Sequence, residues 1–268
     1  MRTRSALRCA ALLGGAFTLF AAVPATAQDS TGTGRRVTIG AGAQAYARYP
    51  GADDYSIYPM PIVGLRREGQ PMPFKGPDDG FGFGLLGGSG TSFNIGPAVR
   101  FQGRRREDDV GAAVGNVGFT VEAGGFVELY PMENFRLRGE LRKGIGGHDG
   151  LTGDIGADLV LRDTDSYIFS IGPRARWADN DYHDSYFGVP AGLPTPGFTA
   201  YNPGGGFYAV GAVAGYTQRL SRNWGLYGYA GYDRLIGDAA DSPIVRVNGS
   251  RDQFSGGLGL FFEFTVGG

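Results

Sequence analysis

Apolar and polar residues alternate with a period of two along most of the chain. In the segment 151–161 the odd positions carry leucine, isoleucine, alanine or glycine, whereas positions 152, 154 and 158 carry threonine or aspartate. The same alternation recurs at 93–101, 117–129, 135–142, 167–177, 208–219 and 254–264. A period of two is typical of a β-strand with one apolar and one polar face. The sequence therefore predicts an all-β fold.

The patterned segments and their connections indicate how the strands are arranged. Twelve strands are expected, at 36–49, 55–66, 70–76, 80–87, 91–102, 117–130, 134–144, 150–162, 166–177, 205–219, 223–236 and 252–264. Every second connection is a tight turn, and the other set contains all the long segments, including 178–204. Short periplasmic turns, longer external loops and an even strand number are typical of outer-membrane barrels.

Two architectures fit the alternation itself, a soluble sandwich and a membrane barrel. Most of the predicted strands are longer than the usual 5–6 residues and suit a tilted membrane crossing of about 9–11 residues. We therefore predict a single antiparallel up-and-down transmembrane barrel. The strand number is ten if 70–76, which contains Pro71 and Pro73, and 80–87 are not strands.

The first 27 residues have the layout of a secretory signal peptide. Three arginines precede an apolar run at 10–23, and an Ala-Thr-Ala sequence ends at Ala27. Such a segment is removed after export, so cleavage is expected between Ala27 and Gln28. The predicted organisation is a signal peptide at 1–27, a short periplasmic tail at 28–35 and an outer-membrane barrel at 36–268.

Composition narrows the class of protein further. The 49 glycines and 15 prolines among 268 residues disfavour long helices. A formal net charge of −1 lacks the basic footprint of a nucleic-acid binder, so no nucleic-acid partner is expected. Two aromatic groups are consistent with a belt at the membrane interfaces or with aromatic packing, and the sequence does not separate the two. They are Tyr46, Tyr49, Tyr55 and Tyr58, and Trp224, Tyr227, Tyr229 and Tyr232.

Charged residues on the polar faces form the main candidate site. Ten of them, on consecutive predicted strands, would face the lumen: Glu122, Glu128, Arg136, Arg138, Glu140, Arg142, Asp154, Asp158, Arg174 and Arg176. Unpaired burial of such charges is expensive, so they either pair across the lumen or face water. Pairing would close the barrel and suit a scaffold, whereas a water-filled path would suit a solute channel.

The chain offers little catalytic chemistry. His148 and His183 are both expected in external loops, and Ser185 lies two residues from His183. A serine nucleophile needs a base held against it and a group that orients the base, and no orienting group is evident. No enzyme activity, catalytic residue or cofactor is predicted, and a surface-exposed barrel enzyme is a distant third possibility.

Three acidic pairs and one basic run are expected in the external loops. The pairs are Asp53-Asp54, Asp78-Asp79 and Asp108-Asp109. Their oxygens suit Ca²⁺ or Mg²⁺, but the spacing of a calcium-binding loop is absent and no metal site is predicted. The run Arg104-Arg105-Arg106 could contact lipopolysaccharide phosphates as bidentate donors. Outer-membrane lipid and lipopolysaccharide are therefore expected partners.

Several short motifs follow one another in order along nearly the whole chain. They are Tyr49-Pro50-Gly51-Ala52-Asp53-Asp54-Tyr55 with Pro59-Met60-Pro61, Ile95-Gly96-Pro97-Ala98, Gly124-Gly125-Phe126, Gly147-His148-Asp149-Gly150, Ser185-Tyr186-Phe187-Gly188-Val189, 201–208 followed by Trp224, and Asp241-Ser242-Pro243. Together these motifs resemble the MltA-interacting protein (MipA/OmpV) family of Gram-negative outer-membrane barrels. Outer-membrane barrels commonly end on an aromatic residue, whereas here four residues follow Phe264.

The resemblance implies a scaffold for peptidoglycan-remodelling proteins in the cell envelope. The family's best-known member bridges a lytic transglycosylase and a bifunctional penicillin-binding protein. The residues available to dock such partners would be the tight turns and the tail at 28–35. A small-solute outer-membrane channel is the alternative.

Overall fold

The computed structural model describes residues 34–87, 92–163, 166–193 and 195–267. These belong to the second of two compact units, Gly32–Gly268. The expected signal peptide at 1–27, its cleavage position between Ala27 and Gln28, and most of the tail at 28–35 lie outside the described residues.

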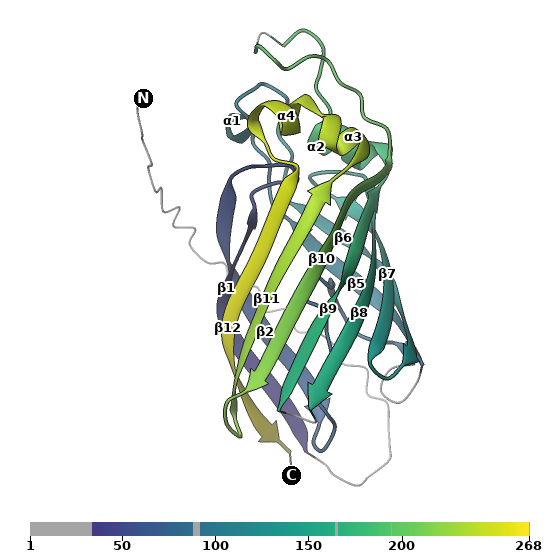
Figure 1. Ribbon diagram of the computed structural model, residues 1–268, viewed down its shortest axis with the longest axis vertical. Helices are drawn as coiled ribbons and strands as arrows, with labels where there is room; N and C mark the ends of the chain where they lie inside the picture. The colour runs from purple at the N-terminus through teal and green to yellow at the C-terminus, as the bar shows by residue number, and fades with distance from the viewer. Residues whose placement is uncertain (1–33, 88–91, 164–165, 194, 268) are drawn as a thin grey trace. The chain divides into compact units, whose positions relative to one another are not determined.

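The described residues form one antiparallel sheet of twelve strands. The strands are β1 (Arg35–Ala47), β2 (Tyr55–Arg67), β3 (Phe81–Gly82), β4 (Leu86–Gly87), β5 (Phe93–Gln102), β6 (Thr120–Met132), β7 (Phe135–Ile145), β8 (Leu151–Asp163), β9 (Tyr167–Ala178), β10 (Gly206–Arg219), β11 (Trp224–Leu235) and β12 (Asp252–Val266). The sheet curls until β1 pairs with β12, and the path of strands runs from β2 through β1 and β12 back to β5 and β3 (Figure 1). The prediction of an all-β, twelve-stranded antiparallel barrel sheet is confirmed.

Two of the twelve strands differ from the prediction. Residues 70–76 are not a strand, and 80–87 forms the two short strands β3 and β4, which both pair with β5. Pro71 and Pro73 have no N–H to give to a ladder, and the chain around them enters the lumen. At the other end of the chain, β12 continues to Val266, so the residues after Phe264 prolong the last strand.

The outer face of the sheet is apolar. Ile57 is 79% exposed and Val63 is 72% exposed, and outward-facing leucine, isoleucine and phenylalanine side chains continue along the other long strands. A soluble protein rarely exposes so large an apolar surface, whereas a membrane barrel presents an apolar band to lipid.

The two aromatic groups divide among three environments. Trp224 and Tyr232 are exposed on the outer face, but Tyr227 and Tyr229 border the cavity inside the sheet. Tyr46 and Tyr58 are stacked with their ring centroids 4.4 Å apart and Tyr46 also borders the cavity. Tyr49 is buried in an apolar core beyond the strands, whereas Tyr55 is exposed. Neither group therefore lies wholly on the outer face, because adjacent strand positions point to opposite faces.

The long loops fold together at one end of the sheet, and we call this region the cap (Figure 1). It contains α1 (Glu107–Val110), α2 (Asn180–Phe187), α3 (Gly237–Asp241) and α4 (Pro243–Asn248). Asp179 caps α2 by accepting from the backbone N–H of Tyr182 at 3.1 Å, and the hydroxyl of Ser242 accepts from Ile244 N–H at 3.2 Å. In the described part of the chain, no helix is long and apolar enough to cross a membrane.

The cap holds the apolar core. Its buried side chains come from every long connection and from strand ends, and include Tyr49, Val110, Val117, Tyr186, Phe187, Val189, Ile244 and Val245. Val117 belongs to this core and bridges to Arg105, so β6 begins at Thr120 and not at the predicted residue 117.

Candidate functional site: a ring of ion pairs in the lumen

Four neighbouring strands, β6 to β9, place the predicted lumen charges on one face of the sheet. Alternation turns every second side chain inward, and the register sets arginine beside carboxylate across the strands. Arg136 lies opposite Asp158, and Glu140 lies opposite Asp154. Arg136 is 1% exposed and Asp158 is fully buried.

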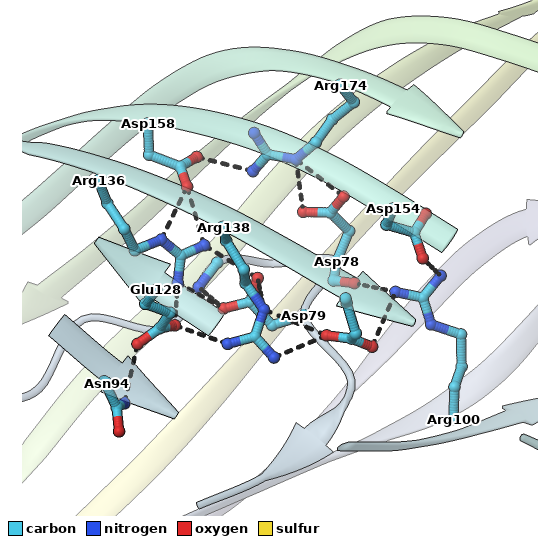
Figure 2. Close-up of polar contacts among 12 residues, drawn as sticks. Asp78, Asp79, Asn94, Arg100, Glu128, Arg136, Arg138, Asp154, Asp158 and Arg174 are labelled. Atoms are coloured by element: carbon cyan, nitrogen blue, oxygen red, sulfur yellow. Dashed lines mark hydrogen bonds and ion pairs between the residues drawn. The ribbon is translucent and has the colours of Figure 1, made fainter. Parts of the chain in front are cut away.

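The arginines and carboxylates alternate around a closed ring. Its ion pairs, in order, are Arg142–Glu140, Glu140–Arg138 at 2.6 Å, Arg138–Glu128 at 2.6 Å, Glu128–Arg136 at 3.0 Å, Arg136–Asp158 at 2.8 Å, Asp158–Arg174 at 2.7 Å, Arg174–Asp78 at 2.9 Å, Asp78–Arg176 at 3.5 Å, Arg176–Asp154 at 2.8 Å and Asp154–Arg142 at 2.5 Å. Figure 2 shows much of this alternation, with Arg100 beside Asp78 and Asp154. Nine of the ten predicted lumen residues are members of the ring, and the tenth, Glu122, pairs with the ring member Arg142 at 2.8 Å.

Residues 68–80 connect β2 to β3, and we call them the inserted segment. This segment supplies two carboxylates beyond those predicted, Asp78 and Asp79. The two terminal guanidinium nitrogens of Arg136 donate to Asp79, at 2.7 and 2.9 Å. The Gly76 N–H donates to the same carboxylate at 2.7 Å. The Phe74 ring lies 4.7 Å from the Arg136 guanidinium carbon, a cation–π distance. The inserted segment is therefore fixed in the lumen by the charges of the wall.

This arrangement corrects the placement of one acidic pair. Asp78 and Asp79 were expected in an external loop, but Arg174 and Arg136 hold them inside the barrel. A buried carboxylate needs a positive partner, and the lumen provides it. Among the described residues, no group of three or more histidine, cysteine, aspartate or glutamate side chains could hold a metal ion.

The two histidines lie in the long loops that form the cap, and both are buried there. His148 Nε2 lies 3.2 Å from Glu122 Oε1, which joins the cap to the ring. His183 lies edge-on to Phe187, with centroids 5.6 Å apart, and burial lowers its pKa from the usual 6.5. The Ser185 hydroxyl donates to the carbonyl of Asp181 at 2.8 Å, so the expected Ser–His neighbours are engaged in helix and core contacts.

The basic run at 104–106 also differs from its prediction. Arg105 is buried and donates to the carbonyls of Tyr186, at 3.0 Å, and Val114, at 3.3 Å; burial lowers its pKa. It therefore ties α2 to the loop after β5 instead of facing lipopolysaccharide, while Arg104 and Arg106 remain exposed. Asp109 is likewise a structural partner and accepts from Arg48 at 2.7 Å.

The sequence of the chain matches the model of one protein family, described as MltA-interacting protein MipA, over residues 39–264. The chain belongs to this family. No curated protein matches it. Together with its apolar outer face, the family identifies an outer-membrane barrel.

Two solved structures to which this MipA-family barrel is similar are distant from it in sequence. The translocator domain of the autotransporter NalP from Neisseria meningitidis is 12% identical, covers 88% of this chain and 90% of that chain, and has a TM-score of 0.42. An outer membrane channel from Pseudomonas putida F1 is 11% identical, covers 88% and 97%, and has a TM-score of 0.37.

Three charged residues outside the predicted set complete the polar interior of this MipA-family barrel: Arg100, Asp233 and Glu263. Arg100 pairs with Asp154 at 3.3 Å, and Asp233 pairs with Arg176 at 2.9 Å. Both lie on inward faces of their strands, so alternation could have found them. Glu263, nearer the tight-turn end, accepts from Thr38 at 3.0 Å and from Arg219 at 2.7 Å.

Beside the ring lies a cavity of about 590 Å³. It extends along β1, β2, β11 and β12, from Tyr49 at the cap to Glu263. The lumen of this MipA-family barrel thus has a half closed by ion pairs and a half that retains space.

Proposed function

We propose that this barrel is a structural scaffold for peptidoglycan-remodelling proteins, which joins a lytic transglycosylase to a penicillin-binding protein at the periplasmic face of the outer membrane. The observation that supports this proposal is the closed ring of ion pairs. Its charges neutralise one another and hold the inserted segment, so they serve the rigidity of the wall instead of an aqueous path. The family name supports a partner of the transglycosylase type.

The docking surface of this scaffold is the end opposite the cap. The tight turn at 131–134 exposes Met132 and Glu133, and the turn at 220–223 exposes Leu220. The carbonyl of Arg222 accepts from Arg36 at 2.8 Å, which fixes this turn against β1. Exposed apolar side chains on fixed turns suit a protein contact.

A crosslinked pull-down from intact envelopes tests the scaffold. We expect the unchanged barrel to capture a murein hydrolase of the transglycosylase type, and a variant with both turns replaced by short Gly-Asn turns to lose most of that capture. The matched control replaces residues 190–192 in the cap, which are exposed on the opposite side. Equal capture by all three proteins would contradict the proposed surface.

A small-solute channel is the second candidate, and the cavity of about 590 Å³ favours it. Single-channel recordings of the purified barrel in planar bilayers separate the two functions. The scaffold predicts electrical silence, because the ring and the cap obstruct the lumen. Stable ohmic steps would favour the channel.

Export by a cleaved signal peptide completes the proposal. We expect the mature chain to begin at Gln28 and to retain the tail at 28–35 on the periplasmic side. The intact mass of protein purified from outer membranes checks the cleavage position.

A further inference from the structure

Among the described residues, β2 has no paired strand on the side away from β1, and we call this opening in the wall the slot. One edge of β2 pairs with β1 along the whole strand, from Tyr55 to Arg67. β2 and β3 stand at the two ends of the strand path, and one cavity reaches Val63 and Leu65 on β2 as well as Phe81 on β3. The inserted segment would supply the missing wall strand if it were not held in the lumen. The slot is therefore the place that this segment leaves empty in the wall.

The free edge of β2 is poorly suited to another polypeptide strand. Pro59 and Pro61 are two positions apart, so their ring nitrogens share one side of the strand, and proline is accommodated where its missing N–H has no ladder partner. That side is the one away from β1. Prolines at an edge block pairing with further strands. The free edge of β2 therefore favours a ligand that forms no hydrogen bonds with the backbone.

The cavity behind the slot touches both faces of the wall. Val63 and Leu65 are outward-facing side chains that meet lipid, whereas Met60, Tyr227 and Tyr229 point inward. One cavity is thus bordered by residues from both faces of the wall. Its volume of about 590 Å³ lies within the 300–1,000 Å³ or so typical of ligand pockets.

Apolar and aromatic side chains form the side of the cavity nearest the slot. Met60, Ile62 and Phe261 contribute apolar surface. The Tyr229 hydroxyl donates a hydrogen bond to Gln44 Oε1 at 3.0 Å. The charged side chains at the far side, such as Asp78 and Arg176, are paired with each other. The near side therefore suits an alkyl chain.

We propose that the slot admits the alkyl chain of an amphipathic lipid from the bilayer into the cavity, while the polar head of that lipid stays at the membrane surface. The chain would lie between β2 and β11, with its methyl end toward Tyr227 and Tyr229. Residues 62–66 are nearer the tight-turn end of β2, so the inner leaflet supplies the lipid. This binding site is separate from the protein-docking surface and does not depend on it.

Photocrosslinking with two palmitic acids tests the proposal, one with a diazirine near the methyl end and one with a diazirine near the carboxyl group. The purified barrel is placed in phospholipid vesicles containing either probe, irradiated, and mapped by peptide mass spectrometry. We expect the methyl-end probe to label residues 226–230 and 60–62, and the carboxyl-end probe to label residues 63–66 and 81. Labelling of the outer face elsewhere gives the background.

Two matched tryptophan variants on β10 separate cavity binding from general lipid contact. Thr217 borders the cavity, so Thr217→Trp should fill it and lower methyl-end labelling of residues 226–230 by at least about fivefold. Ala212 is exposed on the same strand, so Ala212→Trp should leave that labelling unchanged. Heat-modifiable migration in gels verifies that both variants fold as barrels.

Two outcomes would overturn the proposal. Labelling of 226–230 that is no higher than background, or that is equal in Thr217→Trp and the unchanged barrel, would show that no alkyl chain occupies the cavity. Labelling of 226–230 without carboxyl-end labelling of 63–66 would show that the chain enters by another route than the slot.

Discussion

The lumen and the cap bury opposite types of side chain. The lumen buries arginines and carboxylates such as Arg136 and Asp158, whereas the cap buries aromatic and aliphatic side chains such as Phe187 and Ile244. The strands already present their apolar side chains to lipid, so only polar faces remain for the interior. The cap lies beyond the lipid-facing strands and packs as a water-soluble protein does. The solvent outside each region therefore decides what lies inside it.

The two regions also differ in what makes them stable. A buried ion pair gives little net free energy because desolvation offsets its attraction, but removal of one partner leaves a costly unpaired charge. An apolar core gains free energy in proportion to the area removed from water. The stability of the lumen thus depends on every member of the ring of ion pairs, while the stability of the cap depends on close packing without cavities.

The largest expected effect comes from breaking the ring at Arg136, an arginine that pairs with three carboxylates. Arg136→Leu leaves Asp79, Glu128 and Asp158 without their shared cation, and we expect a loss of about 3–5 kcal/mol in the free energy of unfolding. Urea unfolding in vesicles, followed by fluorescence, measures it. Arg234→Ala, which removes an exposed pair with Asp252, is the control and should leave the free energy of unfolding nearly unchanged, because solvent screens the pair. Similar losses in both variants would contradict the comparison.

A cavity in the cap should have a smaller and more local effect. Ile244 is fully buried on α4, and Ile244→Ala is expected to cost about 2–4 kcal/mol. Because the cap core is separate from the ring, hydrogen exchange should accelerate in the four helices and remain unchanged in β6 to β9. Val247, an exposed neighbour on the same helix, provides the control Val247→Ala. Faster exchange throughout the sheet would show that cap and lumen unfold as one.

Neutralising the inserted segment should loosen it without destroying the wall. Asp78→Asn with Asp79→Asn keeps the side-chain size but removes two of the carboxylates that hold residues 68–80. We expect a loss of about 1–3 kcal/mol and faster proteolysis within the segment. Asp53→Asn with Asp54→Asn, at exposed positions, should leave cleavage unchanged. Protection of the segment in the lumen variant would contradict its electrostatic retention.

The smallest effect concerns pH and the cap. Burial depresses the pKa of His183 below 6.5, so the unfolded state takes up a proton at a higher pH than the folded state. The contribution of neutral, buried His183 to the stability of the cap is therefore present above about pH 6.5 and is lost as the pH falls below that value. Hydrogen exchange of α2 should accelerate below that pH, and His183→Phe should remove the change. An equal acceleration in His183→Phe would assign it to other groups.

Much of this molecule follows from local alternation. The strand faces at 120–178, the apolar exterior and the even set of long strands can be obtained from a period of two, because adjacent side chains on a strand point to opposite sides. The same rule brought together ten charged residues on one inner face. It failed at residues 70–76, where a short polar and apolar pattern around Pro71 and Pro73 resembled a strand.

The sequence by itself determined which faces are apolar, where the long strands lie and which of the charges on β6 to β9 point inward, since each of these depends on neighbours along the chain. Only the tertiary structure decided that Asp78 and Asp79 enter the lumen, that His148 and His183 join the cap core, and that a slot remains beside β2. These features depend on partners far away in the sequence, such as Arg136 for Asp79. Loops have no period to indicate such partners; the free energy of pairing buried charges and packing apolar side chains selects them only when the barrel has formed.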